Sequence, residues 1–273
     1  MLNALTIDFE DWHQGLEIPP SGWTGLEDRI AFSGQRILEL LSEAGKKATF
    51  FVLGHLAERH PGLVLEVASE GHEIGTHGYS HTLVYKLEPN EFRADVERST
   101  SLLEDLTGKP VLGHRAPFFS ITNKATWAFE ILAELGIRYD SSVFPIRNYR
   151  YGIRDAPRWP YQIECRTGAL TEFPVSTWAM RRWQLPVAGG AYFRLYPYAL
   201  TRAAFRAINR EGHPAVFYLH PWEVDPGQPR LDLPRRISVP HYWRLAATEG
   251  RFRRLLQDFS FAPMAEVLGV AAP

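Results

Sequence analysis

The sequence has a single cysteine, no surplus of charge of either sign and no long apolar run. One thiol, on Cys165, cannot form a disulfide within the chain and excludes a zinc site built from several thiolates. The 30 Lys and Arg residues are balanced by 31 Asp and Glu residues. Non-specific nucleic-acid binding needs a basic surplus to neutralise phosphates, so we expect no nucleic-acid partner.

The apolar runs are too short for a membrane span. The run at residues 215–219 is among the longest, whereas a membrane-spanning helix needs about 20 apolar residues. We therefore expect a protein that does not span a membrane. At the N-terminus, MLNALTIDFEDW has no basic segment before its apolar stretch and meets three acidic residues at once. No secretory signal is recognisable there, so the expected compartment is the cytoplasm.

What the sequence does contain is a regular alternation of strand and helix patterns. With 273 residues, of which 45% are hydrophobic, the chain can bury a substantial core. Strands are predicted at residues 4–9, 48–53, 73–76, 111–113, 137–139, 172–177 and 215–219. Helices are predicted from residue 33 up to Gly45, from Pro61 up to Gly71, and at residues 91–106, 123–135 and 198–209. Such alternation predicts a parallel sheet with helices outside it.

Two stretches, residues 147–166 and 224–243, break this alternation. Both are rich in large residues, so we interpret them as long loops of the same domain and not as linkers. Residues 252–268 are predicted to form a terminal helix followed by a packed tail. We thus expect one domain over residues 1–273, in which residues 224–273 are a C-terminal loop and helix extension packed on the rest.

The predicted carboxyl ends of five strands carry polar residues, and the chemistry of parallel α/β folds lies at such ends. In chain order these residues are Asp8, Glu10 and Asp11, then His77 and His81, then His114 and Arg115, then Asp140, and lastly His220 and Glu223. A single polar residue at a strand end commonly only caps a turn. Five such ends on one rim favour a functional site.

His77 and His81 are four residues apart, a spacing that brings two imidazoles onto one side of a helical turn. Catalytic zinc sites usually have three protein ligands and a water, so a carboxylate from the first strand would complete the set. The spacing fits a surface pair without a metal equally well, and that alternative stays open here. Among the acids, one would bind the cation while another stays free as a base, paired with Arg115.

The ordered segments TIDFEDW, THGYSH, HRAPFFS and LHPWE resemble the motifs of the polysaccharide deacetylase family, also called carbohydrate esterase family four or the NodB homology domain. They are most similar to the subgroup encoded with exopolysaccharide and exosortase loci. The resemblance covers residues 6–223. It implies an α/β fold, a distorted and incompletely closed (β/α)7-type barrel with long loops. It also implies a divalent metal, most often Zn2+, with Co2+ or Ni2+ as alternatives.

Carried over residue by residue, the resemblance implies that Asp8 is the catalytic base and that Arg115 positions it. His77 and His81 correspond to the two metal-binding histidines, and His220 corresponds to the general acid.

Three further residues concern the substrate. The resemblance implies that the backbone N–H of Phe118 joins the oxyanion site and that Leu219 lines the acetyl pocket. Trp222 is a candidate for stacking on a sugar, although core packing is the commoner reason for a tryptophan.

Two assignments within the motifs stay open, the metal-binding acid of the first motif and the aspartate of the fourth. Many family members have two adjacent aspartates in the first motif, the second of which binds the metal, whereas this sequence reads Asp-Phe-Glu-Asp. Glu10 and Asp11 are therefore both candidate metal ligands, with a slight preference for Asp11. For the aspartate of the family's fourth motif, Asp140 is a candidate by its strand-end position, but it could equally cap a turn.

The expected function is that of a metal-dependent hydrolase that removes acetyl groups, foremost N-acetyl, from a polysaccharide or a lipid-linked glycan precursor. The reaction would take place in the cytoplasm or at the cytosolic face of the membrane. The resemblance implies that a metal-bound water attacks the acetyl carbonyl, with Asp8 as base and His220 as acid. The alternatives are a related amidohydrolase acting on a non-sugar linear or cyclic amide, as in allantoinase-like relatives, and a catalytically silent glycan-binding barrel.

Overall fold

The computed structural model describes residues 1–16, 18–180 and 183–270, which are organised around a nine-stranded sheet. Its strands are β1 (Leu2–Phe9), β2 (Thr49–Val52), β3 (Glu73–Thr76), β4 (Gly113–His114), β5 (Tyr139–Asp140), β6 (Tyr161–Cys165), β7 (Gly168–Glu172), β10 (Val216–Leu219) and β11 (Ser260–Ala262). They follow the order β10-β1-β2-β3-β4-β5-β7-β6, and β11 also pairs with β1. A separate hairpin joins β8 (Thr177–Met180) to β9 (Trp183–Pro186).

Neighbouring strands of the large sheet run parallel, except for the antiparallel pair β6 and β7. The edge strands β10 and β6 are not paired with each other in the described residues, so the barrel is not closed. These observations confirm the predicted α/β class and the incompletely closed barrel.

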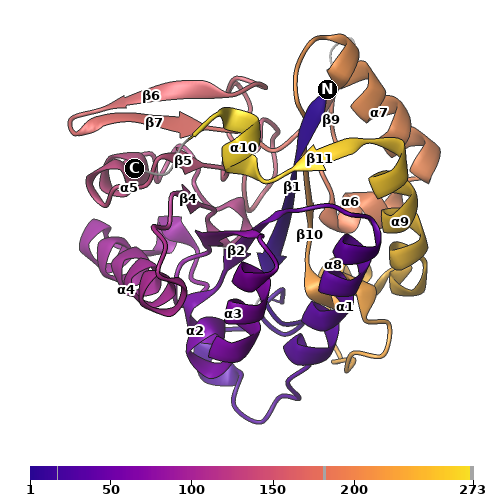
Figure 1. The fold of residues 1–273 in the computed structure, drawn as a ribbon, viewed down its shortest axis with the longest axis horizontal. Coiled ribbons are helices and arrows are strands. Elements are labelled where there is room, and N and C mark those ends of the chain that lie inside the picture. Colours follow the sequence, from indigo (N-terminus) through magenta and orange to yellow (C-terminus); the bar gives the residue numbers. More distant parts are fainter. Residues whose placement is uncertain (17, 181–182, 271–273) are drawn as a thin grey trace.

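Helices cover the outside of this sheet. They are α1 (Ile30–Glu43), α2 (Gly54–Arg59), α3 (Pro61–Ser69), α4 (Pro89–Thr107), α5 (Ala128–Glu134), α6 (Gly190–Leu195), α7 (Tyr198–Arg210), α8 (Arg235–Tyr242), α9 (Thr248–Asp258) and α10 (Met264–Leu268). Short 3-10 turns are η1 (Pro20–Gly22), η2 (Val84–Lys86), η3 (Pro117–Phe119), η4 (Pro221–Val224) and η5 (Leu245–Ala247). Figure 1 shows β1 running through the middle of the molecule, with α3 and α4 on one side and α7 and α9 on the other.

Helix α4 illustrates how local sequence sets these elements. The side chain of Glu88 accepts a hydrogen bond from the Glu91 backbone, and the Glu91 side chain accepts one from the Glu88 backbone, which is a capping box. At the other end Gly108 adopts a left-handed conformation with φ 66°, which ends the helix. The helix buries Phe92 and Val96 against the sheet. Its fixed position matters for the site described below.

Several predicted elements differ from the structure. Residues 172–177 are not one strand, because β7 ends at Glu172 and β8 begins at Thr177. The predicted loop 147–166 contains β6, a half-exposed edge strand whose weak alternation does not stand out in the sequence. Helix α8 lies within the predicted loop 224–243 and contains Pro240, a residue that normally argues against a helix.

The C-terminal region also divides differently from the prediction. Residues 252–268, predicted to form a terminal helix and a packed tail, span the end of α9, strand β11 and helix α10. Strand β11 pairs with β1 beside β10, so the last part of the chain is built into the same sheet as the first. None of the described helices combines the length and apolar character needed to cross a bilayer.

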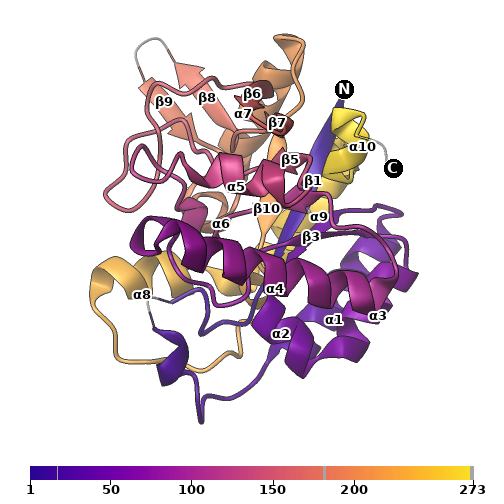
Figure 2. The same ribbon diagram turned by 90° about the vertical axis from the view of Figure 1, so that its left-hand side faces the viewer.

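The β8–β9 hairpin and helices α1 and α2 lie at opposite ends of the molecule (Figure 2). The parallel strands β1, β3, β4, β5 and β10 all direct their carboxyl ends towards one rim of the sheet. Strands β2 and β10 are fully buried, and so is β1 apart from its first residue. The residues that follow these strands are therefore held on a rigid base.

Candidate active site

A cavity of about 160 Å³ opens at the carboxyl ends of the strands. Its floor is formed by residues at the ends of β1, β3 and β10, and these are Asp8, Glu10, His77, His81, Tyr218, His220 and Trp222. Its walls come from η3, from the loop after β5 and from helices α6 and α8. The structure thus brings together most of the residues that the sequence predicted to form a site.

Glu10, His77 and His81 form a buried cluster whose ligand atoms all lie within 4.8 Å of one another. The Nε2 atom of His81 lies 2.5 Å from Oε2 of Glu10, and His77 Nε2 lies 3.7 Å from the same oxygen. His81 Nε2 is buried and has no hydrogen-bond partner among the described residues. Two imidazole nitrogens and a carboxylate oxygen that converge in this way are a donor set that suits a divalent cation.

The residues around this cluster also favour the binding of a cation. His77 Nδ1 donates a hydrogen bond of 2.7 Å to the carbonyl oxygen of Arg115, which leaves Nε2 free to act as a ligand. Burial opposes the charge on Glu10, but the neighbouring imidazoles of His81 and His77 hold the pKa of Glu10 well below its usual range. Glu10 is therefore ionised, as a metal-ligating carboxylate must be.

The loop between the two histidines is not the helical turn that their spacing suggested. Gly78 and His81 both have positive φ, 72° and 57°. The carboxylate of Asp95, on α4, accepts the backbone N–H groups of Tyr79 at 2.7 Å and Ser80 at 3.0 Å. A Cβ on Gly78 would lie 2.8 Å from Asp95 Oδ2, so this position requires glycine. Asp95 was missed by the sequence analysis, because nothing local marks a helix residue that fixes a distant loop.

The structure brings Glu10, and not the preferred Asp11, together with the two histidines. The carboxylate of Asp11 accepts the backbone N–H of Trp12 at 2.7 Å and that of Arg29 at 2.8 Å, away from the two histidines. Burial raises the pKa of Asp11 to about 6, although these hydrogen bonds oppose the shift. The reason is strand geometry: side chains alternate at the end of β1, so Asp8 and Glu10 face the cavity together while Asp11 turns away.

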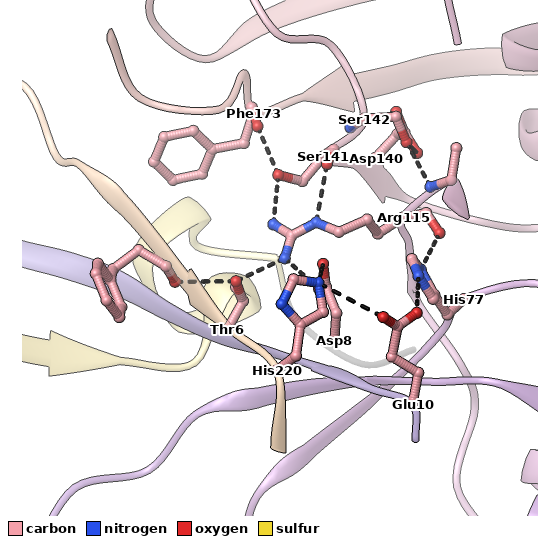
Figure 3. Close-up of polar contacts among 12 residues, drawn as sticks. Thr6, Asp8, Glu10, His77, Arg115, Asp140, Ser141, Ser142, Phe173 and His220 are labelled. Carbon is pink, nitrogen blue, oxygen red and sulfur yellow. Dashed lines mark hydrogen bonds and ion pairs between the residues drawn. The ribbon is translucent and has the colours of Figure 1, made fainter. Parts of the chain in front are cut away.

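Asp8 and Arg115 form a buried ion pair, as predicted. The Nη1 of Arg115 donates 2.7 Å to Asp8 Oδ1 and 2.6 Å to Thr6 Oγ1. Its Nε and Nη2 atoms donate to the backbone and side-chain oxygens of Ser141 (Figure 3). With all of these contacts in place the arginine is immobile, and it holds one oxygen of Asp8 in a fixed position.

His220 faces Asp8 and Glu10 from the end of β10. Its Nε2 lies 3.8 Å from Asp8 Oδ2 and 3.7 Å from Glu10 Oε1. Its Nδ1 donates 2.7 Å to Oε1 of Glu223. Burial lowers the pKa of His220, but the bond to Glu223 and the nearby carboxylates together raise it to about 9. His220 is therefore a cation near neutral pH.

Glu223 is the partner of His220 that the sequence analysis did not assign. Burial would raise its pKa, but Arg194 and His220 lower it to about 2. The signal was present as His-x-x-Glu at residues 220–223, a spacing that lets the side chain of the fourth residue reach back to the first.

Of the three residues predicted to contact substrate, Phe118 and Trp222 line the cavity and Leu219 does not. Phe118 lines the cavity, has φ 53° and packs its ring at 4.9 Å from the ring of His81. Trp222 also lines the cavity, but it is stacked against His220 and His241 and donates its Nε1 to Glu10 at 3.2 Å, so its ring supports the site. Leu219 is in the main hydrophobic core and outside the cavity lining. Strand alternation explains this, since Tyr218 and His220 face the cavity.

Asp140 does not contact Arg115 or His220 through any described hydrogen bond. Its Oδ1 accepts 2.6 Å from Nδ1 of His114 and 2.7 Å from Oγ of Ser142. The Ser142 hydroxyl in turn accepts the backbone N–H of Ala116. Asp140 therefore ties the end of β5 to the end of β4, next to Ser141, which accepts two hydrogen bonds from Arg115.

Comparison with known proteins divides the chain in two. Residues 28–139 match the family model "Polysaccharide deacetylase", and residues 141–269 match a "Domain of unknown function (DUF3473)". The chain is 38% identical over 96 residues to a peptidoglycan-N-acetylglucosamine deacetylase of Bacillus cereus, which covers 35% of each protein. It is 30% identical over 162 residues to a peptidoglycan deacetylase of Helicobacter pylori, which covers 54% of each. The matched part thus spans about a third to a half of these relatives.

Solved structures share the fold. A chain from Mycobacterium smegmatis described as a polysaccharide deacetylase has a TM-score of 0.64 at 22% identity and covers 98% of this chain and 88% of its own. A carbohydrate esterase family four pseudoenzyme from Bacillus anthracis has a TM-score of 0.52 at 15% identity and covers 100% of this chain and 66% of its own. At these identities the likeness concerns the fold alone, and what distinguishes an enzyme from a pseudoenzyme is the set of residues in the site.

Proposed function

Since this chain belongs to the polysaccharide deacetylase family through residues 28–139, we propose that it is a metal-dependent hydrolase that removes acetyl groups, foremost N-acetyl groups, from a glycan. One observation carries the proposal. A donor set for a cation, a carboxylate held by a buried arginine and a cationic histidine all face the same cavity. The names of the relatives, which are deacetylases of peptidoglycan, support an N-acetylated glycan as the substrate class.

Glu10, His77 and His81 are the residues that would hold the cation, for which Zn2+ is the best match and Co2+ or Ni2+ are substitutes. When bound, such a cation supplies a Lewis acid that polarises the acetyl carbonyl and makes a water more acidic. The three ligands come from the ends of β1 and β3, and the hydrogen bond from His77 to the Arg115 carbonyl orients one of them.

Asp8 is the proposed base. Its Oδ1 is fixed by Arg115, and its Oδ2 lies on the side of His220. Because Asp8 is outside the ligand cluster, it is available to accept a proton from the attacking water. Arg115 sets the direction of the carboxylate and balances its buried charge.

His220 is the proposed acid. An amine is a poor leaving group unless it is protonated, so hydrolysis of an acetamide needs a proton donor on the side of the sugar nitrogen. The cationic imidazole offers Nε2 to the cavity while Nδ1 is held by Glu223. Phe118 lines the same cavity in a turn with positive φ, and its backbone N–H is the proposed donor to the oxyanion.

Acetate release is the direct test. Zinc-loaded protein is incubated with N-acetylated chitooligosaccharides and with peptidoglycan fragments, and acetate and new free amines are both measured. We expect equal amounts of the two products, complete loss of activity with a chelator, and a loss of about 10²–10⁴-fold in Asp8→Asn. Asp11→Asn is the matched control and retains activity. If the zinc-loaded protein binds these glycans but releases no acetate, it is a silent binder; if a chelated sample keeps full activity, the mechanism is wrong.

A further inference from the structure

The region that matches a domain of unknown function, residues 141–269, forms one wall of the catalytic cavity. Helix α6 contributes Arg194, and helix α8 contributes Arg236, Ile237, Pro240 and His241. The same region carries His220, which directly follows β10, and Glu223, which lies in η4. The question is how this wall is connected to the groups that act on the substrate.

The side chain of Arg194 connects the wall formed by α8 to Glu223, the partner of His220. It is 1% exposed, and every nitrogen of its guanidinium is used. Nε donates 2.6 Å to Glu223 Oε2. Nη1 donates 2.9 Å to the carbonyls of His241 and Trp243, and Nη2 donates 2.7 Å to the carbonyl of Pro240. One side chain thus joins the carboxyl end of α8 to the carboxylate that holds His220.

A second contact runs in parallel with the first. The ring of His241, on α8, stacks at 4.1 Å on Trp222, and Trp222 stacks at 4.9 Å on His220. Trp222 also donates its Nε1 to Glu10. Helix α8 is therefore linked to the acid through Arg194 and Glu223, and to a proposed metal ligand through Trp222.

We propose that Arg194 is a positioning residue for the reaction: through Glu223 it fixes the imidazole of His220, and through three carbonyls it fixes α8 as the wall of the cavity. Residues 141–269 then form part of the active site itself. This inference rests on the proposed function, because it concerns the residue that protonates the leaving group.

The geometry explains why an arginine is needed. Glu223 is fully buried, and its two oxygens have different partners, Oε1 with His220 and Oε2 with Arg194. Without Arg194 the second oxygen loses its partner, and the carboxylate is held only through Oε1, by the ring and the backbone N–H of His220. His220 then loses the fixed direction of Nε2. A guanidinium has donors in a planar fork that reach a carboxylate and carbonyls at once, which a lysine cannot do.

The effect should depend on the leaving group. A sugar amine must be protonated as it departs, whereas 4-nitrophenolate departs without a proton. Misplacing the acid therefore slows the cleavage of an acetamide but leaves the cleavage of 4-nitrophenyl acetate nearly unchanged. A general loss of folding or of metal would slow both reactions alike.

The experiment compares wild type, Arg194→Gln and Arg251→Gln on N-acetylated chitooligosaccharide and on 4-nitrophenyl acetate, all zinc-loaded. Arg251 is the matched control, since its Nη1 donates to the carbonyls of Phe193, Arg194 and Tyr196 at the end of α6, and no described hydrogen bond joins it to Glu223. For Arg194→Gln we expect kcat on the acetamide to fall by about 10–100-fold, the size typical of lost orientation. KM and the ester rate should change by less than about threefold. Arg251→Gln should keep the wild-type ratio of the two rates.

Two results would overturn the inference: an equal loss on both substrates in Arg194→Gln, or the same change of ratio in Arg251→Gln. If Arg194→Gln does not fold, Glu223→Gln decides by the same ratio, because it keeps a hydrogen-bonding side chain and removes the charge. A wild-type protein that cleaves neither substrate contradicts the proposed function itself, which distinguishes that failure from a failure of the Arg194 assignment.

Discussion

The buried pair of Asp8 and Arg115 makes a prediction about stability that does not depend on knowing the substrate. The side chain of Arg115 is 0% exposed and that of Asp8 is 3% exposed, with 2.7 Å between Nη1 and Oδ1. Replacing Arg115 with Met leaves the carboxylate of Asp8 in the interior without its main partner. Breaking a buried ion pair from one side typically costs about 3–5 kcal/mol.

The structure indicates that the cost of this substitution lies at the lower end of this range. His220, whose pKa is raised to about 9, lies 3.8 Å from the other oxygen of Asp8 and keeps part of the charge compensated. We therefore expect a loss of about 3 kcal/mol. At roughly 2–4 °C per kcal/mol for a chain of this size, Arg115→Met should melt about 6–12 °C below wild type.

The assay is thermal unfolding of metal-free protein, so that a bound cation does not replace the lost charge. The double variant Asp8→Asn, Arg115→Met buries neither charge of this pair and should recover most of the loss. Arg98→Met is the control, because Arg98 and Glu58 form an exposed pair that contributes little. The reasoning is refuted if Arg115→Met has the melting temperature of wild type. It is also refuted if the double variant loses as much stability as the two single variants lose together.

Three further predictions concern other parts of the molecule. Asp95→Ala frees two amides of the loop between the proposed metal ligands His77 and His81 and should weaken zinc binding by about 10–100-fold in a competition assay, whereas Asp105→Ala, on the exposed face of α4, should not. Burial lowers the pKa of His72 to about 4, so its contribution to stability is present above pH 6.5 and is lost as the pH falls towards 4. The unfolding free energy should drop by up to about 1.4 kcal/mol per pH unit in that window, and His72→Gln should reduce this slope in urea titrations; an unchanged slope would contradict the assignment. Gly189→Ala would place a Cβ 1.9 Å from the Tyr218 carbonyl oxygen and should cost about 2–5 kcal/mol, well above the cost of Gly212→Ala, which has open space around it; equal costs would argue against the clash.

The sequence predicts the parallel sheet with helices outside it well, but the details of the site less well. Alternating strand and helix patterns leave a parallel sheet as the only simple arrangement, and polar residues at strand ends must then meet on one rim. Which acid enters the cavity depends on a single residue of register at the end of β1. That register selects Glu10 over Asp11, and the same alternation on β10 selects Tyr218 over Leu219.

Long-range partners escape prediction for a different reason. Asp95 and Arg194 act on residues far from them in the chain, and neither has a local pattern that reveals its partner. Helix α8 was hidden by Pro240, a residue that normally argues against a helix, and the Arg194 side chain that bonds the carbonyls of Pro240 and His241 lies far from it in the sequence. Such residues are found only when the packing of several elements is known.

The central claim is that Glu10, His77 and His81 hold one divalent cation while Asp8 and Asp11 do not. The most direct test is the zinc content of purified variants after equilibration with zinc and removal of the unbound metal. We predict about one zinc per chain in wild type, Asp8→Asn and Asp11→Asn, and almost none in Glu10→Gln and His81→Ala, since three protein ligands are the usual minimum for a catalytic site. A full complement of zinc in Glu10→Gln and His81→Ala, or its loss in Asp11→Asn alone, would contradict the account.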